Sequence, residues 1–130
     1  RSRMAANEAS AVGSLRTINT AEVTYATTYP ATGFGALAAL GGTAATCATT
    51  NGAALANACL IDEVLSLTGV KSGYTFTDVA AGGPPAVTYT SLAVPSALGQ
   101  SGQRAFCSDQ SGVIRYNAGG SACTNADNAL

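Results

Sequence analysis

The sequence predicts an α+β fold in which a long N-terminal helix packs on a four-stranded antiparallel sheet, with disulfide bonds closing the loops. Three observations predict it. Apolar residues recur with the spacing of one helix face from Arg1 to Thr28. From Gly73 onward they alternate with polar residues, as in half-buried strands. Four cysteines can close the glycine-rich segments of this chain of 130 residues, which has the length of one domain.

The predicted helix covers residues 1–29. It ends there because the residue before Pro30 is disfavoured in the helical region. No Ser, Asp or Pro precedes it as a cap, so we expect the helix to continue upstream of Arg1. The side opposite the apolar one carries Ser and Thr. The apolar side is formed by Met4, Ala11, Val12, Leu15, Ile18, Tyr25, Ala26 and Tyr29.

Two carboxylates of this helix, Glu8 and Glu22, fall within its apolar side. A carboxylate that is buried without a partner is costly. Two interpretations therefore stay open. Both acids lie at the margin of the apolar side and reach water, or one of them pairs with an arginine of a neighbouring subunit.

Residues 30–72 are predicted to form a long surface loop with a short helix. Over residues 31–58 the chain is mostly Ala, Thr and Gly, with one helical turn considered at 53–58. The spacing of Leu60, Ile61, Val64 and Leu65 predicts a short helix over 59–67 that ends near Gly69.

Residues 73–116 are predicted to form two consecutive hairpins. Glycine and proline at 82–85 form the first turn, the residues at 109–112 form another, and a bulge is expected near Thr90 and Ser91. The four strands are 73–79, 86–94, 104–107 and 113–116. The face that covers the helix is predicted to carry Tyr74, Phe76, Val87, Tyr89 and Val113.

The cysteines are spaced as C-x11-C and C-x15-C, and the chain has no histidine to complete a zinc site. We favour the two local pairings, Cys47 with Cys59 and Cys107 with Cys123, because each closes a loop that has few apolar residues to hold it. Each disulfide contributes about 2–4 kcal/mol by the usual loop-entropy account. The second ties back the polar ending at 117–130. Disulfides indicate an oxidising compartment.

Several classes of function lose support. The net charge is −1 and the five arginines are scattered, so we expect no nucleic-acid binding by this domain. Without histidine there is no Ser–His–Asp triad, and paired cysteines leave no thiolate, so we expect no enzyme and no cofactor. Five side chains with oxygen atoms lie near the end of the chain: Asp109, Asn117, Asn125, Asp127 and Asn128. They are either ligands of a calcium ion or part of a hydrated loop.

The chain opens with Arg-Ser-Arg-Met-Ala-Ala-Asn-Glu-Ala-Ser-Ala-Val, and residues 106–115 read Phe-Cys-Ser-Asp-Gln-Ser-Gly-Val-Ile-Arg. A long helix, a linking loop, an antiparallel sheet and a cysteine-bounded ending in this order resemble the headgroup of a type IV pilin or pseudopilin. The resemblance implies a precursor whose apolar half-helix, absent here, is cleaved and methylated at its mature N-terminus. It also implies that 31–58 is the αβ-loop and that 107–123 is the D-region.

By this resemblance the protein is a structural subunit of a type IV pilus used for adhesion, twitching motility or DNA uptake. It is anchored in the inner membrane with a periplasmic headgroup, and it later forms a homo-oligomeric filament at the cell surface through its N-terminal helix. The subunit-contact candidates are Arg3, Glu8, Ser14, Thr17 and Glu22.

Two alternatives stay open. A pseudopilin of a type II secretion system resembles a pilin but tends to hold its last loop with calcium rather than cysteines. A secreted carbohydrate- or peptide-binding module would need exposed aromatic rings, for which Tyr29, Phe34 and Tyr116 are the candidates.

Overall fold

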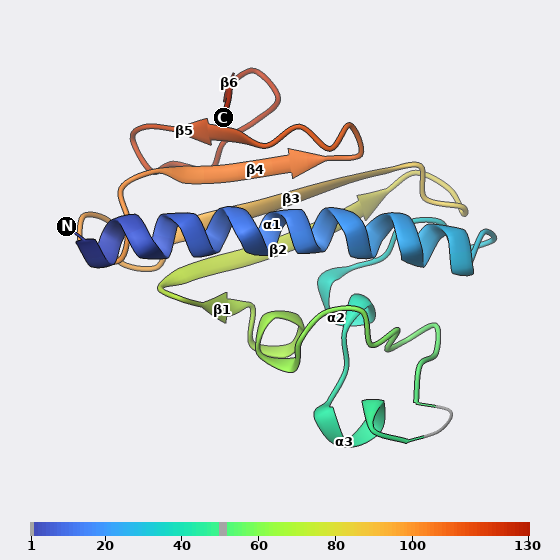
Figure 1. The fold of residues 1–130 in the computed structure, drawn as a ribbon. Helices are drawn as coiled ribbons and strands as arrows, with labels where there is room; N and C mark the ends of the chain where they lie inside the picture. The colour runs from blue at the N-terminus through green and yellow to red at the C-terminus, as the bar shows by residue number, and fades with distance from the viewer. Residues whose placement is uncertain (1, 50–51) are drawn as a thin grey trace.

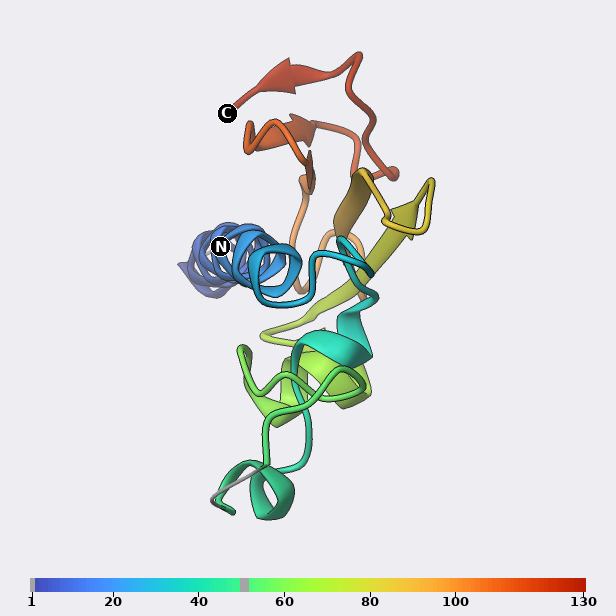
Figure 2. The same cartoon turned by 90° about the vertical axis from the view of Figure 1, so that its right-hand side faces the viewer.

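The computed structural model describes residues 2–49 and 52–130. One long helix, α1 (Ser2–Thr28), lies across one face of an antiparallel sheet. Figure 1 shows the helix in front of the strands, and Figure 2 looks along the helix so that the two layers separate. Arg1, which the predicted helix included, lies outside the described residues, as do residues 50 and 51 of the predicted loop.

The apolar side of α1 forms the core with the inner face of the sheet. Leu15 and Ile18 are fully buried on the helix, and Tyr74 and Phe106 are fully buried on the strands. Each buried side chain of this size stabilises the fold by about 1.5–3 kcal/mol. The helix spacing therefore predicts correctly which side of α1 meets the sheet.

The sheet has six strands, so the prediction of four is wrong. They follow one another in chain order, each antiparallel to the next. The two additional strands are the edges, and each has two residues, too few to show an alternating pattern. The strands are β1 (Val70–Lys71), β2 (Tyr74–Ala81), β3 (Thr88–Pro95), β4 (Ala105–Asp109), β5 (Arg115–Asn117) and β6 (Asn128–Ala129).

The predicted bulge in β3 is wrong, because β2 and β3 pair without interruption from Tyr74 opposite Pro95 to Ala81 opposite Thr88. The inner face of β3 continues through Ser91 and Ala93, both fully buried. These small residues leave room for α1 and break the apolar pattern on which the prediction relied. Two of the predicted inner residues lie elsewhere: Val87 is 64% exposed and Val113 is 37% exposed, whereas Tyr74, Phe76 and Tyr89 are buried as expected.

The loop region contains more local structure than predicted, and its helix starts later. Short helices α2 (Leu37–Leu40) and α3 (Ala44–Cys47) precede a single π-helical turn, η1 (Val64–Thr68). Gly69 ends η1 with a φ of 68°, which glycine adopts without strain. Residues 58–60 are not helical, because their N–H groups bond to carbonyls of 39–41. The turn considered at 53–58 is an isolated bridge between Ala54 and Asn57.

The predicted disulfide pairing is confirmed. Cys47 bonds to Cys59 and Cys107 bonds to Cys123, with Cα atoms 5.7 Å apart in each case. The second disulfide holds the polar ending against β4, which allows β6 to pair with β5.

Candidate assembly surface

The five predicted subunit-contact residues differ in their exposure to solvent. Arg3 and Thr17 are exposed on α1, whereas Ser14 and Glu22 are buried against the sheet. The Glu8 side chain is 14% exposed and faces the start of β4. Arg3 and Thr17 are therefore accessible from outside the chain, whereas Glu8 and Glu22 bond within their own chain and Ser14 is buried.

Glu8 bonds to an arginine of its own chain. Its Oε2 accepts the N–H groups of Gln103 and Arg104 at 3.1 and 3.0 Å, and its Oε1 accepts Arg104 Nε at 3.1 Å. The Arg104 guanidinium also lies over the rings of Phe106 and Tyr116. Burial raises the pKa of Glu8, but the two N–H donors and the guanidinium outweigh it and hold that pKa below its usual value.

Glu22 has an acid as its neighbour. It is fully buried on α1, and Asp78 of β2 is 5% exposed beside it. Glu22 Oε1 accepts the N–H of Gly35 at 2.9 Å. A Cβ at Gly35 would stand 2.7 Å from the Tyr25 ring, so glycine lets this backbone approach the acid. Both ion pairs of the described residues, Lys71–Asp62 and Arg104–Glu8, lie elsewhere, so the two acids have no cation.

One proton shared between the two acids would satisfy them. With both ionised, Glu22 Oε2 and both Asp78 carboxylate oxygens have no donor among the described residues. Burial first, and then the hydrogen bond and charge of Glu22, raise the pKa of Asp78 to about 10. Burial also raises the pKa of Glu22. Asp78 therefore keeps its proton at neutral pH and donates it to Glu22.

A second polar contact fastens the middle of α1 to the sheet. Tyr89 of β3 donates its hydroxyl to Asn19 Oδ1 at 2.8 Å, and Asn19 Nδ2 donates to Ser108 Oγ at 3.0 Å. Burial, with the charges of Glu22, Asp78 and Asp109, raises the pKa of Tyr89. The orientation of α1 is thus set by polar contacts as well as by apolar packing.

The side of α1 away from the sheet is almost uncharged. We call it the outer stripe, and Arg3 and Arg16 are its charged residues because both acids of α1 face inward. It runs the length of the helix, about 40 Å at 1.5 Å per residue. Its exposed residues are Ser2, Arg3, Ala5, Ala6, Ala9, Gly13, Arg16, Thr17, Thr20, Val23, Thr24, Thr27 and Thr28.

The threonines of the outer stripe satisfy their own hydroxyls. Each donates its Oγ1–H to the carbonyl four residues earlier, at 2.8–3.1 Å, and they are Thr17, Thr20, Thr24, Thr27 and Thr28. A hydroxyl bonded in this way loses little when water is removed from it. The stripe therefore presents methyl groups and small side chains that another helix can cover closely.

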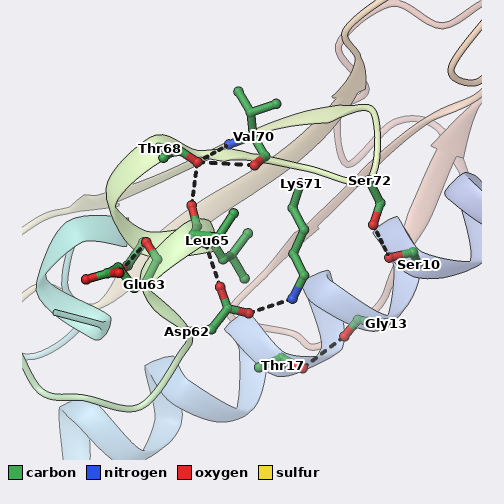
Figure 3. A network of polar contacts seen from close by, with 12 residues as sticks. Ser10, Gly13, Thr17, Asp62, Glu63, Leu65, Thr68, Val70, Lys71 and Ser72 are labelled. Carbon is green, nitrogen blue, oxygen red and sulfur yellow. Dashed lines mark hydrogen bonds and ion pairs between the residues drawn. The ribbon is translucent and has the colours of Figure 1, made fainter. Parts of the chain in front are cut away.

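Two features border the outer stripe. A groove of about 330 Å³ runs between Thr17, Thr20 and Thr24 of α1 and Leu60 of the loop. Near the N-terminal half, Ser10 Oγ donates to Ser72 Oγ at 3.0 Å, and Lys71 pairs with Asp62, whose other oxygen accepts the Leu65 N–H, as drawn in Figure 3. These contacts hold η1 and β1 beside the helix.

The candidate calcium ligands bond mainly to their own loops. Asp109 Oδ1 accepts two bonds from Ser111, and Asp127 accepts Asn117 Nδ2 and the Thr124 N–H. Within residues 2–49 and 52–130, no three His, Cys, Asp or Glu side chains gather as a metal site requires. No helix in the same ranges has both the length and the hydropathy of a membrane span.

The candidate aromatic residues pack against other side chains. Tyr29 lies against Tyr25 with ring centroids 5.0 Å apart, and Phe34 meets Tyr89 edge to face at 4.8 Å. The Tyr116 ring lies under the Arg104 guanidinium.

No protein-family model, curated protein or solved structure matches this chain. Function is therefore inferred from the chain's own residues.

Proposed function

We propose that this protein is a structural subunit of an extracellular filament of the type IV pilus kind, and that α1 packs against α1 of neighbouring subunits through its outer stripe. The observation that carries the proposal is the set of threonine hydroxyls already bonded within α1. This bonding is common for threonine in helices, and on α1 it leaves methyl groups rather than unbonded hydroxyls on the exposed side.

Physical chemistry favours helix packing at this surface. Small residues such as Ala9 and Gly13 allow two helix backbones to approach closely. Val23 is 60% exposed, and covering it would contribute favourable burial. Few charges have to be desolvated, because Glu8 and Glu22 face the sheet.

The disulfides support an extracellular place of action. Cys47–Cys59 and Cys107–Cys123 leave no free thiol among the described cysteines. Disulfides persist in the periplasm and outside the cell. The closure of the last loop by Cys107–Cys123 also supports the pilin over the calcium-dependent pseudopilin alternative.

The test replaces one small residue of the outer stripe with a charge. We expect Thr20→Glu to abolish filaments in the sheared surface fraction of the source cells, because burying a carboxylate at a helix contact is costly even with Arg16 one turn away. The matched control is Thr77→Glu, which places the same charge on an exposed position of β2 on the other face of the sheet. Both variants should keep the thermal unfolding midpoint of the unchanged protein.

Filaments of normal length from cells that carry only Thr20→Glu would overturn the proposal. N-terminal sequencing and intact mass of the native subunit form a second test. The pilin resemblance requires an apolar segment ahead of Arg1 that starts with a methylated residue, and an ordinary monomeric secreted chain would contradict it.

A further inference from the structure

A cavity of about 430 Å³ lies on the face of the sheet that points away from α1. Its floor is built by strand register: Leu92 of β3, Cys107 of β4 and Arg115 of β5 lie opposite one another in one row. Thr90 and Asp109 are paired in the next row of the same face. Residues 122–125, held by the Cys107–Cys123 disulfide, form its rim.

Two opposite charges line this cavity without neutralising each other. Asp109 and Arg115 form no ion pair, since those of the described residues are Lys71–Asp62 and Arg104–Glu8. Asp109 Oδ1 accepts the Ser111 N–H at 2.9 Å, and Arg115 Nη1 donates to the Asp127 carbonyl at 2.9 Å. Both contacts orient the charged groups. They leave the Asp109 carboxylate and the Arg115 guanidinium without a counter-charge.

The surface between the charges is apolar. Leu92, Val113 and the Cys107–Cys123 disulfide all line the cavity. Asp109 and Arg115 stand on neighbouring strands two residues out of register, so their Cα atoms are about 8 Å apart by sheet geometry. The cavity of about 430 Å³ has room for a small ligand that contacts both charged groups.

We propose that this cavity binds a small zwitterion, an α-amino acid or dipeptide with an aliphatic side chain. Its ammonium group meets Asp109 and its carboxylate meets Arg115, whose planar guanidinium suits a carboxylate. Its hydrocarbon part lies on Leu92 and the disulfide. This activity goes beyond the proposed filament role, and the cavity and the outer stripe lie on opposite sides of the molecule.

The chemistry of the lining selects against other ligands. One acid and one base favour neither a simple anion nor a simple cation. A sugar ring usually stacks on an aromatic side chain, and none of the described residues lining the cavity is aromatic. The volume falls in the range of small-molecule pockets, about 300–1,000 Å³.

The experiment is an amide NMR titration of the disulfide-bonded protein with L-leucine and L-leucyl-L-leucine. We expect saturable shifts confined to the cavity residues, including Thr90, Asp109 and Thr124. N-acetyl-L-leucine lacks the ammonium group and L-leucinamide lacks the carboxylate, so each should bind about tenfold more weakly. These ligands need no change in the protein, and they keep the test valid if a variant fails to fold.

Matched variants locate the interaction. Asp109→Asn and Arg115→Gln should each weaken L-leucine binding about tenfold. Asp62→Asn and Arg3→Gln, which remove the same charges elsewhere, should leave it unchanged. No saturable shift with either zwitterion, equal binding of N-acetyl-L-leucine, or a response to maltose alone would each overturn the proposal. None of these results depends on whether filaments form.

Discussion

Glu8 and Glu22 lie on the same side of the same helix, about four turns apart, yet their surroundings shift the carboxyl pKa in opposite directions. Glu8 meets two backbone N–H groups and Arg104. Glu22 meets one N–H group and a second acid, Asp78. The first environment lowers the pKa of its carboxyl, and the second raises it.

The comparison teaches that a carboxylate within an apolar helix face has two ways to avoid an unpaired buried charge. Glu8 remains ionised because its donors replace the lost water. Glu22 relies on a proton held by Asp78, so its burial depends on pH. Four measurements follow, from the largest expected effect to the smallest.

The acid pair should make the protein less stable as the pH rises. Asp78 has a raised pKa, so the folded state binds more protons than the unfolded state between the ordinary pKa of 3.8 and about 10. Stability from this group is complete below that window and is lost through it. The slope is up to about 1.4 kcal/mol per pH unit, or about 4 kcal/mol from pH 5 to pH 8.

Urea unfolding at several pH values with the disulfides intact measures this slope. The chain has no histidine, so no other side-chain class with an ordinary pKa titrates near pH 6.5. A free energy of unfolding that stays flat between pH 5 and pH 8 would contradict the shared proton.

Asp78→Asn should remove most of this slope and raise the free energy of unfolding at pH 8 by about 2 kcal/mol. The amide of the new side chain donates permanently to Glu22, so no second charge can form. Asp62→Asn serves as the control, because Asp62 is exposed and pairs with Lys71. The control should keep the slope of the unchanged protein, and an identical slope in Asp78→Asn would locate the titration elsewhere.

Glu8→Gln should lower the free energy of unfolding at pH 7 by about 1 kcal/mol, since the hydrogen bonds to Arg104 and Gln103 lose their charge. The folded pKa of Glu8 is lowered, so its stabilisation is present above the ordinary value of 4.5 and is lost as the pH falls. The difference between variant and unchanged protein should therefore vanish near pH 2. A loss that persists there would indicate packing rather than charge.

The smallest effect concerns assembly. Glu8→Gln and Glu22→Gln should leave filament formation by the native subunit unchanged, because both side chains bond within their own chain. Electron microscopy of the sheared fraction, with Thr20→Glu as the positive control, measures this. Loss of filaments in either glutamine variant would mean that an acid changes partners during assembly.

Much of the fold was predictable because it depends on neighbours in sequence. The period of 3.6 residues identifies α1, and alternation after Gly73 identifies β2 and most of β3. The local disulfide pairings also follow from the composition of the loops between the cysteines. The edge strands β1 and β6 carry two residues each and exist only because a longer strand lies beside them.

The candidate sites divide in the same way. The sequence by itself determined that α1 has an apolar side, that its threonines occupy the opposite side, and that Glu8 and Glu22 lie in unusual positions, but it wrongly placed Ser14, which is buried, with the threonines. Only the tertiary structure decided which groups these two acids meet, Arg104 and Asp78. It also brought Asp109 of β4 and Arg115 of β5 to the same face of the sheet. The reason is physical: the charge state of a buried acid depends on which groups the fold brings within a few ångströms of it, and those groups are distant in sequence.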